Sequence, residues 1–591
     1  MDFEVLAEAF EKMTKTSSRT ELTSILVELL RKTPKSLISR VSYLIQGKLY
    51  PDFIPVNIGM AEKTAAKAIE MAYSTTPEKI LELSRKTGDL GTVAERLSDR
   101  KAPTLFSSGN LTVEDVYSTF EEIASTSGKG SSSVRMSRLS MLLNSASHLE
   151  AKYLIRFLTG SLRLGVADFT VLDALAVAFT ENKKNREILE NSYNLTSDLG
   201  YVADLLANGG IKAVQKIKVT AGKPVRPMLA ERMESAEQII EKMNFDASAE
   251  YKLDGERAQI HKTKDGKITI FSRRLEQITD QYRDVAEALK TLPARDFIVE
   301  GEVVAIDKHG RYLPFQELMH RRRKYDLEKA MKDYPVVVNL FDVLLFDGES
   351  KLDEPYSERR KTLEDAHARI KDNEKVMLVP AKRVRKAIEI DSLMEESLSI
   401  GCEGLVVKDP KSAYRAGARE YVWIKLKPEY RPNIRDTLDL VIVGANHGMG
   451  RRAGVYGAFL LAAYDLSEDI FRTTTKVGTG FTDEDLEKIS KILDEHKLDV
   501  KSPRVEARVE SEAWFEPKIV VEIIASEITL SPIYTAGLDL VRKDSGFALR
   551  FPKFTGKIRD DKSPEDATTI QELLEVYQRQ VRQFRSTERD S

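Results

Sequence analysis

The lysine in the segment "EYKLDGERAQIH", residues 250–261, is the first candidate for chemistry. The Asp254-Gly255 pair between alternating flanks favours a β-hairpin, in which Lys252 would be a solvated surface charge. The alternative is that the amine of Lys252 attacks the α-phosphate of a nucleotide and holds it as a phosphoramidate. Because a free lysine is almost wholly protonated at neutral pH, that chemistry needs neighbouring cations or a metal ion.

A pair of carboxylates supplies one candidate metal site. In "DFIVEGEVVAID", Glu300 and Glu302 are two residues apart on an expected strand, so both side chains project from the same face. Mg²⁺, which binds a few carboxylates together with phosphate oxygens, would neutralise them. An ordinary solvent-facing strand explains the pair equally well, and the spacing does not decide which glutamate would bind a metal.

Further charges flank apolar runs. In "CEGLVVKD", Glu403 precedes the run and Lys408 follows it. In "REYVWIKLKPEY", Arg419 precedes Lys425 and Lys427, which share one face of an extended segment. A phosphate between the two lysines would offset their repulsion, although such a pair is more often found on a solvated edge strand than at a phosphate site.

Three regions must position these residues. Helical periodicity dominates residues 1–218 and predicts an all-helical domain. After the linker-like "TAGKPVRPMLA", short strands alternate with helices over residues 219–430. Residues 431–591 contain short strands with Gly-rich turns, which predict a small β-barrel, and the tail beyond Ser563 returns to helix.

Composition limits the class of protein. A length of 591 residues predicts two to four domains, and a net charge of -2 excludes a uniformly basic coat. Contacts with nucleic acid would therefore come from local patches such as "GKGSSSVR" (128–135) and "GMGRRAG" (448–454). The single cysteine, Cys402, excludes a disulfide framework and a Cys-rich zinc module. We find no signal peptide and no apolar run that spans a bilayer, so we expect a cytoplasmic protein, nucleoid-associated if archaeal.

One aromatic residue completes the series of motifs. Phe341 in "NLFDVLLFDG" lies in an apolar run, which favours a core position, and the alternative is a pocket wall that stacks on a purine. In order along the chain, Lys-x-Asp-Gly, the acid pair, this aromatic strand, Glu-Gly-x-x-x-Lys and Lys-x-Lys resemble the motifs of the covalent nucleotidyltransferases.

The resemblance narrows to the ATP-dependent DNA ligases of the archaeal and eukaryotic replicative type, and covers nearly the whole chain. "GSLRLGVADFTVLDALA" resembles that family's DNA-binding domain, while "KVGTGFTDEDL", "ASEITLSPIYTAGL" and "LRFPKFTGKIRDDKSPEDATT" resemble its OB-fold domain. It implies a multidomain α+β protein with an all-helical N-terminal DNA-binding domain (1–218), a central α+β nucleotidyltransferase (adenylation) domain (219–430), and a C-terminal OB-fold β-barrel with a terminal helix (431–591).

The resemblance also implies roles for individual residues. Lys252 would accept AMP, with Lys425 and Lys427 gripping the phosphates beside it. The implied nucleotide-binding residues are Glu250, Arg257, Arg273, Glu302, Phe341, Arg419, Lys425, Arg559 and Lys562. Glu302 and Glu403 would be the metal ligands. Arg274 in "FSRR" stands where some relatives have a neutral residue, which leaves the local contact there open.

The implied activity is sealing of nicks in duplex DNA through lysyl-AMP and adenylated DNA, in replication, repair, recombination and cell division. The cofactors would be ATP and Mg²⁺, and the partner nicked double-stranded DNA, with a sliding clamp as a further candidate partner and the protein a monomer. Two alternatives stay open: an RNA-capping guanylyltransferase, and a DNA clamp that keeps the fold without the chemistry.

Overall fold

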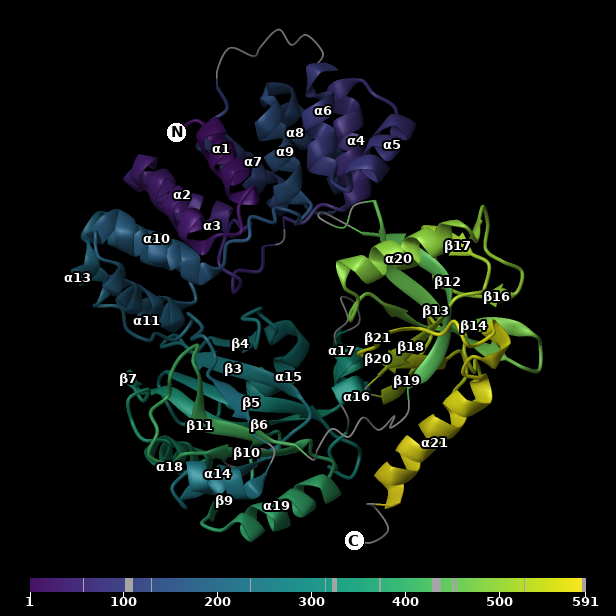
Figure 1. Ribbon diagram of the computed structural model, residues 1–591. Coiled ribbons are helices and arrows are strands. Elements are labelled where there is room, and N and C mark those ends of the chain that lie inside the picture. Colours follow the sequence, from purple (N-terminus) through teal and green to yellow (C-terminus); the bar gives the residue numbers. More distant parts are fainter. Residues whose placement is uncertain are drawn as a thin grey trace. The chain divides into compact units, whose positions relative to one another are not determined.

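The computed structural model describes residues 1–56, 58–100, 110–128, 130–233, 235–313, 315–321, 327–370, 374–427, 437–448, 452, 454–525 and 527–586. The chain forms two compact units (Figure 1). The first contains Met1–Tyr73 and Ser98–Pro428, and the second Ser74–Leu97 and Glu429–Ser591. Of the helices in the described part of the chain, none is long and apolar enough to cross a membrane.

The N-terminal part of the first unit is helical, as its periodicity predicts. Its helices are α1 (Phe3–Thr14), α2 (Arg19–Lys32), α3 (Ile38–Ile45), α4 (Glu62–Tyr73), α7 (Val113–Ser125), α8 (Ser131–Ser145), α9 (His148–Leu158), α10 (Asp168–Thr180), α11 (Arg186–Thr196), α12 (Leu199–Gly209) and α13 (Ile211–Val214). Local signals set several of their starts. The Ser147 and Glu150 side chains form a capping box at α9, and Asp198 accepts a hydrogen bond from the Tyr201 amide at α12.

The rest of the first unit contains two sheets. The five-stranded sheet has the order β1 (Leu229–Arg232), β11 (Arg419–Leu426), β10 (Gly404–Lys408), β2 (Ala247–Lys252), β9 (Ala381–Val384). The six-stranded sheet has the order β4 (Ile268–Ser272), β3 (Glu256–Lys262), β5 (Phe297–Ala305), β6 (Val336–Phe346), β7 (Glu349–Ser350), with β8 (Val376–Leu378) beside β6. Its helices are α14 (Ala236–Lys242), α15 (Arg283–Leu289), α16 (Phe315–Met319), α17 (Leu327–Asp333), α18 (Tyr356–His367) and α19 (Ala387–Ser399).

The hairpin expected around Lys252 does not form. Strand β2 pairs with β10 and β9, whereas β3 pairs with β4 and β5, so the chain passes from one sheet to the other at Asp254-Gly255. Gly255 has no positive φ. A Cβ there would lie 2.3 Å from the carbonyl oxygen of Val303 and 2.9 Å from Cγ of Glu302, so close approach to β5 requires the glycine.

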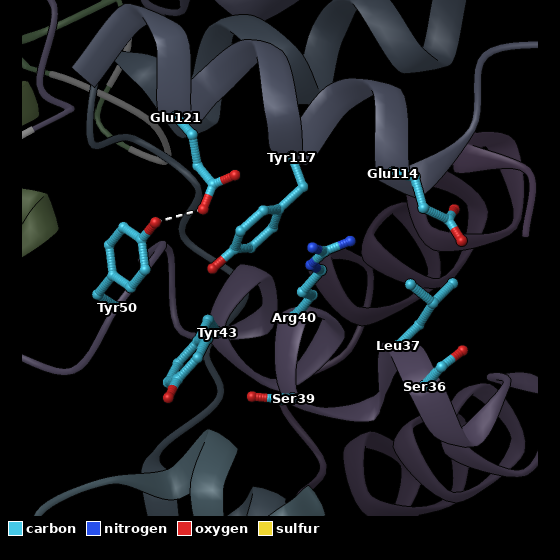
Figure 2. A pocket seen from close by; sticks show the side chains of 9 residues that line it. All are labelled: Ser36, Leu37, Ser39, Arg40, Tyr43, Tyr50, Glu114, Tyr117 and Glu121. Atoms are coloured by element: carbon cyan, nitrogen blue, oxygen red, sulfur yellow. Dashed lines mark hydrogen bonds between the residues drawn. The ribbon is translucent and has the colours of Figure 1, made fainter. Parts of the chain in front are cut away.

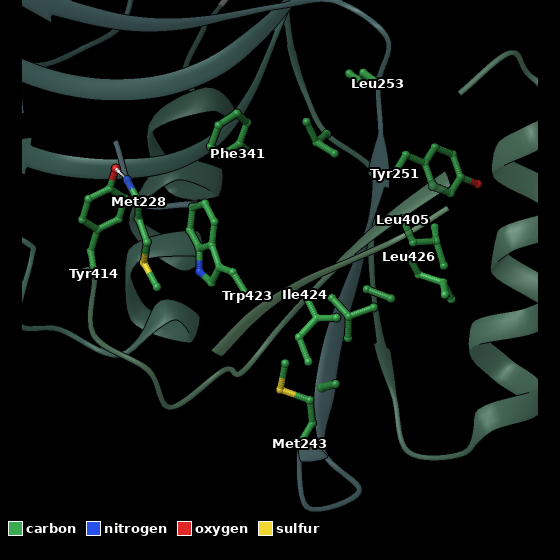
Figure 3. Packing of buried hydrophobic residues seen from close by; sticks show 14 of the residues in the cluster. Met228, Met243, Tyr251, Leu253, Phe341, Leu405, Tyr414, Trp423, Ile424 and Leu426 are labelled. Carbon is green, nitrogen blue, oxygen red and sulfur yellow. Dashed lines mark hydrogen bonds between the residues drawn. The ribbon is translucent and has the colours of Figure 1, made fainter. Parts of the chain in front are cut away.

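Apolar side chains of the five-stranded sheet form a core with neighbouring residues. Figure 3 shows part of this core, in which the hydroxyl of Tyr414 accepts a hydrogen bond from the amide of Met228 at 2.9 Å. The rings of Tyr414 and Phe341 both meet Trp423 edge-on, at centroid distances of 5.8 and 6.2 Å. A second core lies against the six-stranded sheet and includes Val299 and Val303 of β5 and Val285 and Leu289 of α15.

The second unit is rich in strands. Its larger sheet has the order β15 (Lys497–Leu498), β17 (Ala513–Phe515), β12 (Leu438–His447), β13 (Tyr456–Asp465), β14 (Ile470–Val477), β16 (Val505–Glu506), and β18 (Val520–Ile524) joins β12 to β21 (Lys553–Ile558). Strands β19 (Glu527–Ser531) and β20 (Gly546–Arg550) pair separately, and the helices are α5 (Pro77–Thr87), α6 (Leu90–Leu97), α20 (Asp483–Asp494) and α21 (Ile570–Ser586). The strands are consistent with the expected OB-fold, and α21 confirms the helical tail.

Parts of two expectations fall outside the described residues. The basic segment 128–135 includes residue 129, and the segment 448–454 includes residues 449–451 and 453. In the described remainder, the Arg135 guanidinium donates to the carbonyl of Thr126 at 2.7 Å, and Arg452 pairs with Asp483 at 2.9 Å. The domain boundary expected at residue 430 also falls in an undescribed segment.

Candidate active site

Three strands of the five-stranded sheet place the candidate residues on one face. In the register of these strands, Lys252 lies opposite Gly404 and Glu250 lies opposite Val406. Val406 in turn lies opposite Lys425 on the next strand. Because side chains alternate along a strand, Lys252, Glu250, Lys408, Lys425 and Lys427 project to the same side. The face predicted to be shared by Lys425 and Lys427 therefore also holds Lys252, Glu250 and Lys408.

The ammonium groups of Lys252 and Lys427 share one carboxylate. Oxygen Oε2 of Glu403 lies 2.5 Å from each Nζ. Each side chain of this lysine cluster (Lys252, Lys427 and Glu403) is about one quarter exposed, so a ligand can reach the group. Burial works to raise the pKa of Glu403, but Lys252 and Lys427 outweigh it and lower this pKa to about 2.

More cations gather around the lysine cluster. Burial and the charges of four neighbouring cations lower the pKa of Lys425. These neighbours are Arg419, Lys252, Lys427 and Arg273. A site with this excess of positive charge suits a ligand with several negative charges, such as a polyphosphate.

Glu302 carries the second predicted metal-binding carboxylate. Burial raises its pKa to about 7, against the opposing charges of Lys252 and Arg257. Glu403 and Asp254 also act on this group, which places three carboxyl groups near Lys252. Within the described ranges, no three His, Cys, Asp or Glu side chains converge as a complete metal site. The pair Glu302 and Glu403 nevertheless fits Mg²⁺, which takes one or two carboxylates and completes its shell with water and substrate phosphates.

Glu300 has a different environment, although it lies only two residues from Glu302. Its side chain is fully buried, and Oε2 accepts hydrogen bonds from the guanidinium of Arg257 at 2.7 Å and the hydroxyl of Tyr414 at 2.9 Å. Its Oε1 accepts from Nε2 of Gln259 at 3.2 Å. These partners occupy both oxygens, which favours Glu302 over Glu300 as the metal ligand.

Buried hydrogen bonds continue from Glu300 along β3. Gln259 exchanges hydrogen bonds with the backbone of Val225, and its Oε1 also lies 2.9 Å from Nε2 of His261. Nδ1 of His261 accepts from the amide of Gly222 at 2.9 Å. The support network, defined as Arg257, Gln259, His261, Glu300 and Tyr414, thus fastens the segment before β1 to strand β3. Arg257, expected to contact the nucleotide, has its guanidinium engaged within this network.

Glu250 and Phe341 lie around a buried lysine. The carboxylate of Glu250 contacts Nζ of Lys408 at 2.6 Å and accepts a short hydrogen bond from the hydroxyl of Tyr356. Nζ of Lys408 also lies 4.8 Å from the ring centroid of Phe341 and 4.3 Å from that of Trp423. Burial lowers the pKa of Lys408 and raises that of Glu250.

The residue-level expectations omitted Lys408 and Tyr356 from the site. The position of Lys408, at the end of β10 and five residues after Glu403, contained a usable signal. Tyr356 begins helix α18, and no local pattern connects it to Glu250. Its contribution depends on a contact between segments 106 residues apart.

Arg559 and Lys562 lie in the second unit. One nitrogen of Arg559 contacts both oxygens of Asp439 at 3.1 and 2.9 Å, and Nζ of Lys562 contacts Oδ2 of Asp439 at 2.6 Å. Asp561 accepts from the other edge of the Arg559 guanidinium at 2.9 and 2.8 Å. The two predicted phosphate-contacting cations therefore form a pair around a carboxylate.

A cavity of about 500 Å³ lies in the helical part of the first unit (Figure 2). It is lined by Ser36, Leu37, Ser39, Arg40, Tyr43, Tyr50, Glu114, Tyr117 and Glu121. Burial, and after it the hydrogen bond to Glu121, raises the pKa of Tyr50 to about 12. Burial is also the largest cause of the raised pKa values of Tyr43 and Tyr117. These phenols stay protonated at neutral pH, so the cavity lacks the activated nucleophile expected of the active site.

Family comparisons agree with this geometry. Residues 2–176 match the DNA ligase N terminus, residues 227–427 match the ATP dependent DNA ligase domain, and residues 452–562 match the ATP dependent DNA ligase C terminal region. The chain is 48% identical to the DNA ligase of Nitrosopumilus maritimus (strain SCM1), over 98% of each chain. It is 46% identical to the DNA ligase of Saccharolobus solfataricus, again over 98% of each chain.

A solved structure supports the fold. The chain is similar to the protein named "Pmar-Lig_PreS3", with a TM-score of 0.56 and 17% sequence identity, over 94% of this chain and 99% of the other. Two of the family matches contain the candidate residues: residues 227–427 include Lys252, Glu302, Glu403 and Lys427, and residues 452–562 include Arg559 and Lys562. The chain belongs to the ATP-dependent DNA ligases.

Proposed function

We propose that this protein joins the 3′-hydroxyl and 5′-phosphate at a nick in duplex DNA, with Lys252 as the group that accepts AMP from ATP. The contact of Lys252 and Lys427 with the same oxygen of Glu403 carries the proposal. It fixes the amine at the edge of a reachable, strongly cationic surface, where an α-phosphate would be neutralised during an in-line displacement.

The reaction has three displacements at phosphorus. Nζ of Lys252 loses a proton and bonds to the α-phosphorus of ATP, and the bond to pyrophosphate breaks. The 5′-phosphate of the nick then bonds to the α-phosphorus, and the amine of Lys252 leaves and regains a proton. Finally the 3′-hydroxyl loses its proton, bonds to the 5′-phosphorus and releases AMP.

The other residues orient the nucleotide in this proposal. Lys425, Lys427, Arg419 and Arg273 neutralise the phosphates, and Phe341 provides an aromatic face for adenine. Glu250, held by Lys408, reads the base, and Arg257 holds the sugar side of the pocket through its place in the support network. Glu302 and Glu403 would hold Mg²⁺, which when bound supplies charge neutralisation at the transferring phosphate.

Three regions would divide the work: residues 1–218 for DNA binding, 219–430 for adenylation and 431–591 for closing over the nucleotide through Arg559 and Lys562. The partner is nicked duplex DNA, bound through phosphate contacts that do not depend on base sequence. A monomer is sufficient for this mechanism, and a sliding clamp is a further candidate partner.

The test follows the label on AMP. The protein is incubated with Mg²⁺ and α-labelled ATP or GTP, beside Lys252→Ala, and then chased with nicked duplex DNA. We expect a labelled protein only with ATP and an intact Lys252, and loss of the label as the nick closes. An adduct formed with GTP that ignores the nick would instead favour the RNA-capping reaction. The absence of any adduct would favour a clamp without chemistry.

A further inference from the structure

In the second unit, the carboxylate of Asp439 contacts two cations, Arg559 and Lys562. Its Oδ2 contacts both Arg559 at 2.9 Å and Lys562 at 2.6 Å, so a single oxygen joins the two cations. The side chain of Asp439 is 9% exposed, whereas those of Arg559 and Lys562 are 22% and 33% exposed. The carboxylate is therefore the buried member of the group, and the cations are its accessible members.

The backbone holds Asp439 firmly. Residue 439 lies in β12 opposite Glu522 of β18, and its amide and carbonyl both bond to Thr568, at 2.9 and 2.8 Å. The amide of Arg559, which directly follows β21, donates to the carbonyl of Val520 in β18 at 2.8 Å, so Arg559 and Asp439 are both anchored to β18. A fixed carboxylate opposite a fixed arginine sets the position of the guanidinium more narrowly than an exposed partner would.

Arg559 has two further acidic partners, the buried Glu522, whose Oε2 lies 3.8 Å from the same nitrogen, and the exposed Asp561. Asp561 holds the opposite edge of the guanidinium but is 67% exposed, so exchanging it for a phosphate costs little desolvation. Removing Asp439 would destabilise the group, because no carboxylate would then join Arg559 to Lys562, and Arg559 would keep only the longer contact with Glu522 and the exposed pair with Asp561. When a phosphate binds Arg559, the geometry favours replacement of Asp561 by the phosphate and retention of the contact with Asp439.

We infer that Asp439 is a positioning residue for the first step of the reaction, in which it holds Arg559 and Lys562 as a pair that receives neighbouring phosphates of ATP. The inference rests on the proposed function, which assigns these two cations to the nucleotide. Like charges separate when no anion lies between them, so loss of the carboxylate should spread the pair and weaken its grip on ATP.

The test separates the ATP-dependent step from the last step. For Asp439→Asn, formation of the labelled lysyl-AMP adduct is measured against ATP concentration, and sealing of a nick that is already adenylated is measured without ATP. We expect the KM for ATP to rise about tenfold, while sealing of the adenylated nick changes by less than about twofold. Asp439→Glu, which keeps the charge, should restore much of the affinity for ATP.

A matched control comes from the same unit. Asp465 pairs with Arg472 at 2.6 Å, and both side chains are 14% exposed, so Asp465→Asn removes a comparable ion pair away from Arg559. This variant should leave the KM for ATP unchanged. Melting temperatures of both variants show whether either substitution unfolds the unit.

Each remaining outcome has one meaning. If Asp439→Asn leaves the KM for ATP unchanged or lowers it while Arg559→Ala still impairs adduct formation, the inference about Asp439 is wrong and the proposed function stands. If the Asn and Glu variants are equally impaired, or both steps fall together, the charge does not act by positioning and the inference is again wrong. If Arg559→Ala leaves adduct formation intact, the proposed role of Arg559 and Lys562 at the nucleotide is wrong, and the inference about Asp439 is wrong with it.

Discussion

The lysine cluster and the support network each contain a glutamate with cationic partners, but the two glutamates have different environments. In the lysine cluster, Lys252 and Lys427 share one carboxylate, and each side chain is about one quarter exposed. In the support network, the carboxylate of Glu300 is fully buried, and three side chains bond to its two oxygens. Charges that are shared and reachable remain available to a ligand, whereas charges that are buried and fully bonded hold the strands in place.

The contrast predicts that Lys252→Ala gives the largest loss of activity. The substitution removes the only atom to which AMP is proposed to bond, so adduct formation should fall by at least about 10⁴-fold. Labelled ATP measures the adduct, and sealing of an adenylated nick without ATP serves as the folding control. If Lys252→Ala still formed substantial adduct, another residue would be the nucleophile and the comparison would lose its basis.

Glu403→Gln sharpens the comparison from within the lysine cluster. Without the shared negative charge, Lys252 and Lys427 repel each other and one predicted magnesium ligand is lost. We expect adduct formation to slow by about 10²- to 10³-fold, with little change in melting temperature because the group is partly exposed. The Mg²⁺ concentration that gives half-maximal rate should rise; an unchanged value would argue against Glu403 as a metal ligand.

The paired variants Glu300→Gln and Glu302→Gln compare the two groups directly. Glu300→Gln leaves the guanidinium of Arg257 without its buried counter-charge, which should lower the free energy of unfolding by about 3 kcal/mol. Trp423, whose ring centroid lies 5.7 Å from that guanidinium, reports unfolding of this region by fluorescence. Glu302→Gln should leave the free energy of unfolding unchanged, because burial already disfavours the ionised form of Glu302. It should slow adduct formation instead. The reverse pattern would exchange the roles of the two glutamates.

Sequence patterns predicted the parts of this arrangement that depend on local order. Alternation along a short strand placed Lys425 and Lys427 on one face, and the periodicity of the first 218 residues predicted its helices. The expected hairpin at Asp254-Gly255 was wrong, because strands distant in sequence decide which partners β2 and β3 take. Spacing alone could not separate Glu300 from Glu302, since alternation gives both the same face and only their neighbours differ.

Most of the site features that the sequence did not predict depend on contacts between residues far apart in the chain. Asp439 lies 120 residues before Arg559 as one acid in an apolar run, and nothing local marks it as the partner of two cations. The hydrogen bond between Tyr356 and Glu250 also joins distant segments, 106 residues apart. Such contacts follow from tertiary packing, which residue spacing does not encode.

His261 offers the smallest effect and tests the support network through pH. Burial lowers the pKa of its imidazole to about 3, and the ring is neutral, with Nδ1 accepting from Gly222 and Nε2 donating to Gln259. A proton on Nδ1 would face the amide hydrogen of Gly222. Because the unfolded chain binds this proton near pH 6.5 and the folded chain does not, its contribution to stability is complete above that pH. It is lost as the pH falls from about 6.5 towards 3.

The expected slope for one proton is about 1 kcal/mol per pH unit on the acidic side of pH 6.5. His261→Gln removes the titration, so its urea-unfolding midpoint should fall less between pH 7 and pH 5 than that of the unchanged protein. His309→Gln, at an exposed loop position, should keep the original pH dependence. Equal slopes in all three proteins would mean that the buried imidazole takes up its proton without opening the network. The support network would then be less rigid than its bonded geometry implies, and its distinction from the lysine cluster would rest on Glu300 alone.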